Sequence, residues 1–364
     1  MAGRSSNVNP GEGDRPVMKS SLLHHAPPLF GKGPEEDVVF ASRTRFARNL
    51  VAFPFPGRAG NGELAQVFEA VAAACEPETP LGPLRLVKIW ELEANDRHWF
   101  VEQHVVSPAL VTHPLHRGVA YREDGLVSVM INEEDHVRLQ AMRPGLDLTV
   151  AYLAADQLDD WLGRELDYAF DPEWGFLTTH VANLGTGMRA SVMCHLPALA
   201  MIGRLDEVLN AAGQLGITIR GVHGEGSEGR GDLIQVSNQF GLGWKEDEIV
   251  RNVAAVARHL VEGERSAREA LKRDRRSEVE DAAWRAYGTL RYARLLEAEE
   301  AMHLLSLVRL GQLLGVLKDL DTALVKALMV VVQPAVLETL VGPSKGRPTA
   351  FRRARFIRDV LAAS

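Results

Sequence analysis

Two kinds of charged residue in this sequence could do chemistry together: arginines that suit a phosphate and carboxylates that suit a cation. Arg43 and Arg45 lie two residues apart in Ser-Arg-Thr-Arg, so they share one face of an extended chain. Phe176–Arg189 is small and polar, with glycines at 185 and 187, and such a segment turns backbone N–H groups toward an anion. Because a guanidinium matches phosphate oxygens and stays charged at any working pH, these segments predict a phosphate site lined by arginines.

The carboxylates come from an acidic run at 132–136 and a glycine-rich loop at 220–232. Glu134 lies in the first segment and Glu225 in the second. A guanidinium group fits between two such carboxylates, because each can hold it through paired hydrogen bonds. Its pKa of about 12.5 makes it a poor nucleophile, so a positioned carboxylate must help to remove a proton as phosphorus is attacked. Alignment and charge stabilisation, which arginines and Mg²⁺ supply, complete the requirements of phosphoryl transfer.

Each motif also has a plainer interpretation. Taken alone, the acidic run reads as a solvated turn at the end of a strand, and Arg43 and Arg45 read as an exposed edge strand. The glycine-rich loop could be ordinary surface, although its glycines around Glu225 suit a mobile lid over a substrate. The occurrence of all these motifs in one chain favours a shared site.

Charge and composition exclude several classes of ligand. The chain has 364 residues and a net charge of −7, with 46% hydrophobic and 24% charged residues, as in an ordinary soluble globular protein. The negative balance argues against nucleic acid as the main ligand. Lysine is absent from Ile89 to Trp244. Since the P-loop and the protein-kinase fold each need a lysine in a fixed place, arginines must bind any phosphates here.

Targeting signals and cysteines point to a reducing compartment. No apolar run approaches the roughly 20 residues that span a bilayer, so we expect no membrane association. Residues 1–26 lack the apolar core of a secretory signal, and we interpret them as a disordered leader. Cys75 and Cys194 are too few for a disulfide framework or a metal cluster. We therefore expect a cytoplasmic protein with no metal site of its own.

Hydrophobic periodicity changes near residue 245. Before it, apolar alternation predicts strands and helical spacing predicts helices. Strands are expected at 38–50, 84–92, 139–142, 191–196, 217–222 and 233–238, with a hairpin at 118–132 that turns at 122–125. Helices are expected at 62–75, 96–104, 146–168 and 197–213. After it, long helices are expected at 246–271 and 277–320, with Pro334 breaking the next one. This pattern predicts an α+β catalytic domain at 27–245 and a helical domain at 246–364.

Four segments resemble the guanidino (phosphagen) kinases, and their order along the chain is the family's: SRTRFARNL, INEEDHVR, NLGTGMRAS and RGVHGEGSEGRGDLIQVSNQ. The resemblance covers about Val38 to Leu242 and is closest to the bacterial protein-arginine kinases. Those enzymes move the γ-phosphoryl group of ATP onto arginine side chains of proteins and so mark them for Clp proteolysis. The early position of the acidic run and the long helical C-terminus both fit this branch.

The resemblance implies a large antiparallel sheet flanked by helices, with ATP and Mg²⁺ as cofactors. It implies that five arginines line the nucleotide phosphates: Arg43, Arg45, Arg138, Arg189 and Arg220. It also implies that Glu134 and Glu225 hold the substrate guanidinium and that either one serves as the base. The partners that it suggests are proteins with exposed arginines, a zinc-binding activator protein and Clp protease components. The apolar C-terminal helices are compatible with a homodimer.

Two positions depart from the family pattern. His180 replaces the cysteine that is thought to lie beside the guanidinium, and we count it among the catalytic residues. A neutral imidazole can accept a hydrogen bond there, whereas a protonated one repels the substrate, so we expect activity that is reduced or shifted to higher pH. In the family's Arg-Asp-x-x-Arg-Ala motif, which binds phosphoarginine allosterically, Thr349-Ala350 replaces Arg-Asp while Arg353 remains. We expect weak or absent activation by phosphoarginine.

Two other functions stay open at this point. One is a kinase of a small guanidino compound such as free arginine. The other is an inactive adaptor that binds nucleotide or phosphoarginine, which the two departures suggest. The presence of Glu134, Glu225 and all five arginines argues against the adaptor, because a binding relic has no evident need for acceptor carboxylates.

Overall fold

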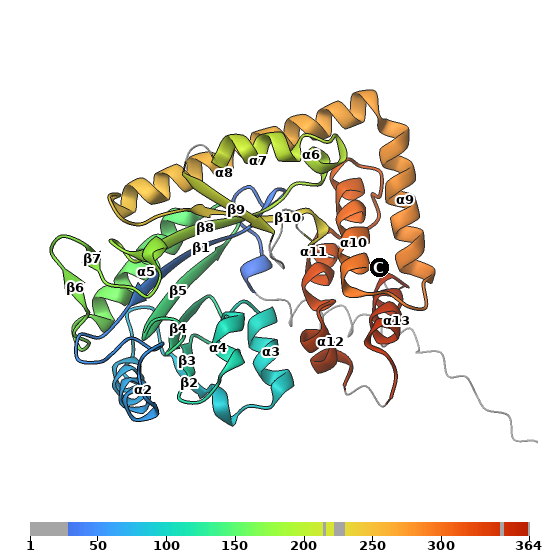
Figure 1. Cartoon of the computed structure of the whole chain (residues 1–364). Helices are drawn as coiled ribbons and strands as arrows, with labels where there is room; N and C mark the ends of the chain where they lie inside the picture. Colours follow the sequence, from blue (N-terminus) through green and yellow to red (C-terminus); the bar gives the residue numbers. More distant parts are fainter. Residues whose placement is uncertain (1–27, 214–215, 222–229, 343–345, 363–364) are drawn as a thin grey trace, which may run out of the picture. The chain divides into compact units, whose positions relative to one another are not determined.

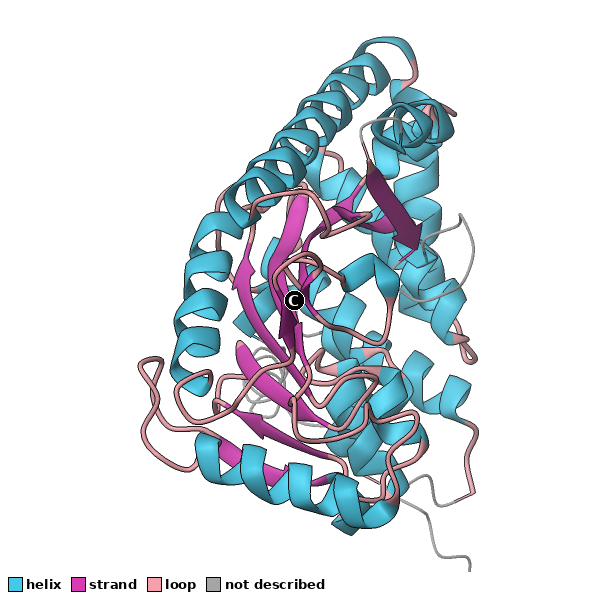
Figure 2. Ribbon diagram, turned by 60° about the vertical axis from the view of Figure 1, so that its left-hand side comes forward, coloured by secondary structure: helices cyan, strands magenta, loops and turns pink. Residues whose placement is uncertain are grey.

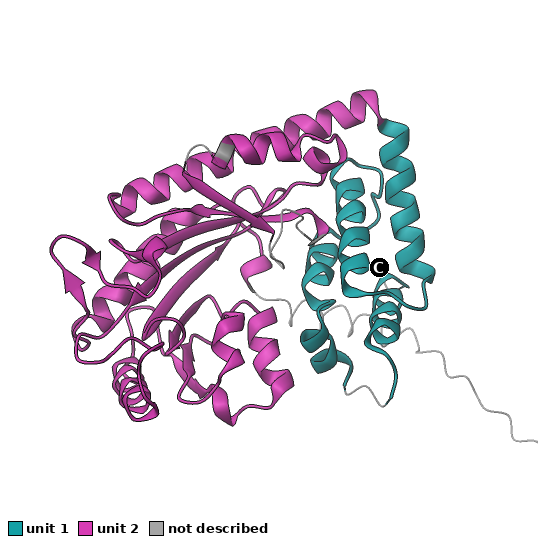
Figure 3. Cartoon of the chain, viewed as in Figure 1, with its two compact units in different colours: residues 1–26, 276–364 teal, residues 27–275 magenta. Residues whose placement is uncertain are grey.

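The computed structural model describes residues 28–213, 216–221, 230–342 and 346–362. The expected leader at 1–26 and the expected catalytic residue Glu225 lie outside the described residues. The described chain forms two compact units, one ending at Arg275 and the other beginning at Arg276 (Figure 3).

An eight-stranded sheet organises the unit that ends at Arg275 (magenta in Figure 3; strands labelled in Figure 1), and every neighbouring pair of strands in it is antiparallel. The strand order is β2-β3-β4-β5-β1-β8-β10-β9. The bounds are β1 Val39–Arg48, β2 Arg85–Lys88, β3 Gly118–Tyr121, β4 Val127–Ile131, β5 Val137–Pro144, β8 Met188–His195, β9 Ile217–Gly221 and β10 Leu233–Asn238. The expectation of a large antiparallel sheet is confirmed, and Figure 2 shows its twist.

Helices and short connections surround the sheet. The helices of this unit are α2 Asn61–Cys75, α3 Ala94–Glu102, α4 Pro108–Thr112, α5 Leu148–Leu162, α6 Pro197–Met201, α7 Leu205–Gly213 and α8 Glu246–Asp274. A separate two-stranded hairpin joins β6 Phe170–Asp171 to β7 Gly175–Phe176, and 3-10 turns lie at η1 Pro28–Phe30, η2 Ile89–Glu91, η3 Val181–Asn183 and η4 Arg230–Asp232. The helix expected at 197–213 is two helices, because Gly203 adopts a positive φ of 72° between them.

Strand β1 lies at the centre of the sheet, between β5 and β8. Its side chains alternate between two faces. Phe46 lies on the face covered by α5 and α8, together with Leu139 of β5 and Val192 of β8, and all three are buried. Arg43 and Arg45 point to the other face. The burial of one face by apolar side chains therefore sets the direction of the arginines.

The long helix α8 belongs with the sheet. It contacts β8 and β10, and its buried stripe includes Ile249, Val253 and Leu260. The chain divides after Arg275 for this reason, whereas the sequence expectation placed the division at residue 246. Helical periodicity predicts that α8 has an apolar face but does not say which element covers that face.

The unit that begins at Arg276 (teal in Figure 3) is helical, as expected. Its helices are α9 Arg276–Tyr292, α10 Ala298–Leu313, α11 Thr322–Val331, α12 Pro334–Val341 and α13 Thr349–Ala362. The single helix expected at 277–320 is thus divided into α9 and α10. Arg353 is 2% exposed and donates hydrogen bonds to the carbonyls of Leu296 (2.9 Å) and Val332 (2.6 Å). This residue therefore joins three helical segments of the unit.

No single helix among the described residues is long and apolar enough to cross a bilayer. The pair α11 and α12 reaches the required length and composition only when counted together, and it is bent by 105°.

Candidate active site

The strand register places all five expected phosphate-binding arginines on one face of the sheet. Arg43 and Arg45 alternate along β1, and Arg45 lies opposite Arg189 of β8. Arg138 of β5 lies opposite Ala47, one position further along the same face. Arg220 of β9 reaches this face through two further pairings, Arg220 with Gln235 and Gln235 with Met193, which lies opposite Ala41. Directly paired residues of an antiparallel sheet share a face, so the five side chains form one arginine cluster.

The arginine cluster is electrostatically unfavourable on its own. Burial, with added repulsion from Arg189 and Arg138, lowers the pKa of Arg43 to about 10. Burial and the neighbouring arginines also lower the pKa of Arg45, and burial together with Arg220 and Arg138 lowers that of Arg189. Guanidinium groups that lower one another's pKa in this way favour the binding of a polyanion, because its negative charge compensates their positive charge.

Three atoms of the cluster lack hydrogen-bond acceptors. The Nε atoms of Arg45, Arg138 and Arg189 are buried, and none has a partner within the described residues. A buried donor without an acceptor costs free energy, which a ligand oxygen can recover. The arrangement fits a triphosphate. Two other bonds hold arginines in place: Arg43 Nη2 donates to Gln235 Oε1 and Arg189 Nη2 donates to Ser237 Oγ, each at 3.0 Å.

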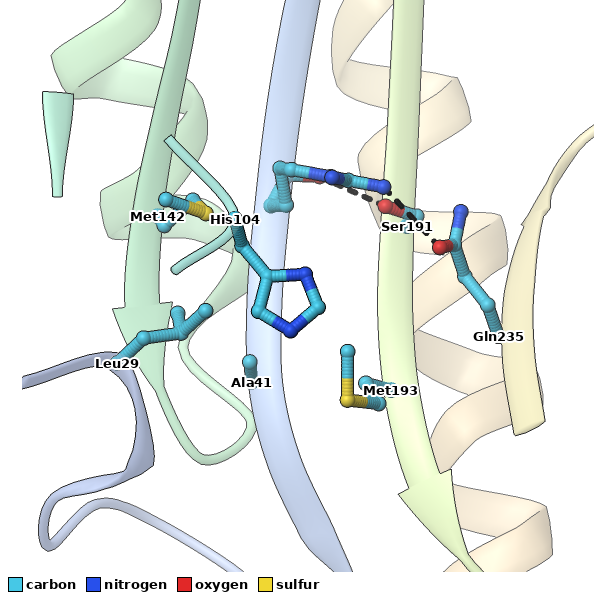
Figure 4. A pocket seen from close by; sticks show the side chains of 8 residues that line it. Leu29, Ala41, His104, Met142, Ser191, Met193 and Gln235 are labelled. Carbon is cyan, nitrogen blue, oxygen red and sulfur yellow. Dashed lines mark hydrogen bonds between the residues drawn. The ribbon is translucent and has the colours of Figure 1, made fainter. Parts of the chain in front are cut away.

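A pocket with largely apolar walls adjoins Arg43 at one end of the cluster (Figure 4). It is lined by Leu29, Ala41, Arg43, His104, Met142, Ser191, Met193 and Gln235. Two thioethers and an imidazole give polarizable walls, and Ser191 and Gln235 add polar groups. Walls of this kind suit a flat aromatic base with polar edges.

Carboxylates occupy the opposite end of the cluster. Arg138 Nη1 lies 2.5 Å from Glu133 Oε2 and 2.6 Å from Glu134 Oε1. Burial opposes the charged forms, yet the two glutamates raise the pKa of Arg138, and Arg138 with the Ser107 hydroxyl lowers that of Glu133. Glu133 is buried with these partners, whereas the Glu134 side chain remains 24% exposed. Glu134 is therefore the carboxylate that a substrate can reach.

His180 lies against Glu134. Its Nε2 is 2.9 Å from Glu134 Oε2, and its side chain is 61% exposed. Glu134 is thus held at one oxygen by Arg138 and approached at the other by His180. The imidazole stands beside the carboxylate oxygen that a guanidinium would use.

A hydrogen-bond network positions Glu134 and His180 relative to each other. Asp135 Oδ1 accepts bonds from the Asn49 amide and from the backbone N–H of Thr179, both at 2.7 Å. The Thr179 hydroxyl donates to the backbone carbonyl of Glu134 at 2.7 Å. The loop that carries His180 is therefore tied directly to the loop that carries Glu134.

Arg48, which faces away from the cluster, fixes the next part of the same loop. It pairs with Asp159 of α5, donates to the carbonyl of Thr186 at 3.0 Å, and lies 3.6 Å from the ring centre of Phe176. Gly187 follows with a φ of 65°, and a Cβ there would lie 2.6 Å from the Ala47 carbonyl. Only glycine fits this approach of the loop to β1.

The functional groups follow one another along β1 in a fixed order. The pocket with largely apolar walls lies at Ala41 and Arg43, the arginine cluster continues through Arg45, and Arg138 with Glu134 lies beside Ala47. Six residues of strand span about 20 Å. A base, a polyphosphate and a cation could therefore bind in line.

Sequence reasoning missed several residues of this site. Gln235 and Ser237 alternate with buried Ile234 and Val236, so the period of two along 233–238 was the signal that could have placed them on the arginine face. His104 follows α3 and Leu29 lies in η1, and no local pattern connects either of them to the site.

Known structures share this fold. A duplicated taurocyamine kinase from Schistosoma mansoni matches with a TM-score of 0.59 and 25% identity, over 68% of this chain and 37% of that chain. A lombricine kinase matches with a TM-score of 0.57 and 20% identity, over 71% of this chain and 78% of that chain. Residues 66–267 match the family model for the C-terminal catalytic domain of ATP:guanido phosphotransferases. The fold and the site thus define a guanidino kinase.

The remaining comparisons identify the branch. Residues 276–364 match the model of the protein-arginine kinase McsB C-terminal domain. A protein-arginine kinase of Desulforamulus reducens is 44% identical over 317 residues, which cover 86% of this chain and 89% of that protein. Those of Moorella thermoacetica and Bacillus subtilis are each 42% identical, over 95% and 91% of this chain and over 100% and 92% of their own lengths. The chain belongs to the protein-arginine kinase family of ATP:guanido phosphotransferases.

Proposed function

We propose that this chain transfers the γ-phosphoryl group of ATP to the guanidinium groups of arginine residues in proteins. The order of groups along β1 carries the proposal: a pocket with largely apolar walls, then the arginine cluster, then an accessible carboxylate. The names of the relatives support a protein rather than a free amino acid as the acceptor.

Each residue then has a defined task. Arg43, Arg45, Arg138, Arg189 and Arg220 would compensate the charge of the phosphates before and during transfer, as fixed charges do without reorganising. Glu134 would hold the acceptor guanidinium and take the proton that leaves nitrogen as the phosphorus–nitrogen bond forms and the bond to ADP breaks. Glu225, as the second carboxylate, stays a prediction because it lies outside the described residues.

Mg²⁺ is part of this proposal as a companion of the nucleotide. No group of three or more His, Cys, Asp or Glu side chains suitable for a metal occurs among the described residues. Mg²⁺ usually binds through substrate phosphates and one or two carboxylates at most. The ion would therefore arrive with ATP, and the arginine cluster would supply the protein's own share of charge stabilisation.

The cellular role is a further part of the proposal. Phosphoarginine on proteins would mark them for a Clp-type protease in the cytoplasm, with a zinc-binding activator protein as a partner and a homodimer as an assembly. The resemblance of the four sequence motifs to the protein-arginine kinases supports the first three points, and the apolar C-terminal helices support the last.

Incubation with γ-labelled ATP tests the acceptor class. We expect acid-labile label on casein and little on free arginine, and Glu134→Gln should reduce the label at least 100-fold. Label on free arginine alone would support the small-molecule kinase, and no label with retained nucleotide binding would support the inactive adaptor. Full turnover in Glu225→Ala would remove Glu225 from the site.

A further inference from the structure

Three chain segments meet beside His180 and Glu134. The backbone N–H of Gly241 donates to the carbonyl of Ala182, which places 239–244 against 180–185. A Cβ on Gly185 would lie 2.7 Å from Leu242 Cα, so these backbones approach closely. On its other side Gly185 pairs with Phe176 at the end of the β6–β7 hairpin. The three segments therefore form a continuous border at the acceptor end of the site.

This border carries an unusual share of exposed apolar side chains. Of the fifteen large hydrophobic side chains that are exposed among the described residues, six lie on these three segments. We call the four of these on the two segments beside His180 the acceptor rim: Val181, Phe240, Leu242 and Trp244. Val181 is 76% exposed and follows His180 directly, and Phe240 is 50% exposed. Exposed apolar groups on segments that lie side by side indicate a binding surface.

The position of the acceptor rim selects its occupant. A free guanidino compound ends within the reach of Glu134 and has no part that could cover such a border. A protein acceptor continues on both sides of its arginine, and each neighbouring residue adds about 3.5 Å of extended chain. Val181 follows His180, whose imidazole contacts Glu134, so residues flanking the arginine can reach the rim while the arginine itself complements the charge of Glu134.

We propose that the acceptor rim binds an extended protein segment that carries large apolar side chains within about three residues of the acceptor arginine. Burial of such side chains against the rim supplies binding free energy that a guanidinium alone lacks. The proposal rests on the proposed function, because it takes the arginine of a protein as the acceptor. It adds a preference for the sequence around that arginine.

Two peptides of equal length and net charge test the preference. Each carries one arginine, flanked by Leu, Val and Phe in one peptide and by Ser, Asn and Gln in the other. We expect kcat/KM for phosphorylation to be about tenfold higher for the apolar peptide, the factor that a few buried methylene groups provide. Val181→Ser and Phe240→Ser should each move this ratio toward one.

Leu153→Ser is the matched control. Leu153 is an exposed hydrophobic residue of α5, the helix that packs on the opposite face of the sheet, so its variant should keep the wild-type ratio. Thermal unfolding of each variant checks that the fold is intact. Equal kcat/KM for the two peptides in the wild type, or an unchanged ratio in both rim variants, would overturn the proposal.

Peptide binding measured by fluorescence anisotropy without ATP distinguishes a failure of the acceptor-rim proposal from a failure of the proposed kinase function. If the wild type binds the apolar peptide preferentially and the rim variants do not, the acceptor rim is supported even without phosphorylation. In that case only the proposed kinase function fails. If the rim instead joined two copies of the chain, Phe240→Ser would sediment differently from the wild type, and the wild type would bind neither peptide preferentially. That result would overturn the proposal.

Discussion

The contact between His180 and Glu134 predicts that the acceptor binds more weakly at low pH. The imidazole Nε2 lies 2.9 Å from the carboxylate oxygen that faces the acceptor. When protonated, the ring forms an ion pair with Glu134 and competes with the incoming guanidinium; when neutral, it carries no charge and can hold the carboxylate oxygen only through an Nε2–H hydrogen bond.

The size of this effect follows from exposure. With 61% of the His180 side chain exposed, the pair belongs to the class of solvent-screened ion pairs, which contribute about 0.2–1 kcal/mol. That range corresponds to a factor of about 1.4 to 5 in an equilibrium constant. We therefore expect the KM for the acceptor to fall by a factor of about 1.4 to 5 as pH rises through the assay range, with a smaller change in kcat.

The assay measures initial rates against acceptor concentration at saturating Mg-ATP across this range. His180→Gln keeps a polar side chain that does not titrate, so its acceptor KM should vary less with pH. His180→Cys should shift the profile relative to the wild type, because a thiol titrates in a different range. Superimposable profiles for the wild type and both variants would remove His180 from the mechanism.

Four further predictions concern the groups around the arginine cluster. Arg45→Met should lower kcat/KM for ATP about 100-fold. It should also raise the free energy of unfolding by about 1 kcal/mol, because it removes a buried charge that Arg43 and Arg138 repel. A variant less stable than the wild type in urea unfolding would contradict this. Arg138 and Ser107 lower the pKa of Glu133, so its carboxylate stabilises the fold above the ordinary pKa of 4.5, and this stabilisation is lost as pH falls through the lowered pKa. Glu133→Gln should lower the free energy of unfolding by about 3–5 kcal/mol at neutral pH and should lose less further stability in acid than the wild type. If the variant lost as much stability in acid as the wild type does, the assignment would be refuted. Gly187→Ala should lower the free energy of unfolding by about 2–4 kcal/mol because residue 187 has a positive φ and lies close to the Ala47 carbonyl. Gly62→Ala, in α2 with open space around it, should not destabilise the protein. Equal melting temperatures of the two variants would contradict the close approach. Added phosphoarginine should activate the enzyme weakly or not at all, since Thr349 and Ala350 lack the charges of the family's motif, and a clear rise in turnover would contradict this.

Local patterns in the sequence predicted most of the sheet and one side of the site. Alternation along 38–50 placed Arg43 and Arg45 on the same face, and the observed register agrees. The same argument shows why Arg48 differs, because its even position directs it toward Asp159 on the covered face. Period-two reasoning applied to 233–238 would also have found Gln235 and Ser237.

Other features depend on contacts between distant parts of the chain. Leu29, His104 and Met193 line one pocket, although they come from three unrelated segments. The assignment of α8 to the sheet depends on which apolar surface covers its stripe, and the sequence of the helix contains no such information. Likewise, the 2.9 Å contact of His180 with Glu134 requires the Asp135 network that ties their two loops together.

Phosphoarginine-specific mass spectrometry tests the central claim most directly. Casein incubated with Mg-ATP and the wild-type chain should gain phosphate on arginine nitrogen, and the same reaction with Glu134→Gln should give at least 100-fold less. Phosphate found only on serine, threonine or tyrosine, or undiminished phosphoarginine with Glu134→Gln, would contradict the account.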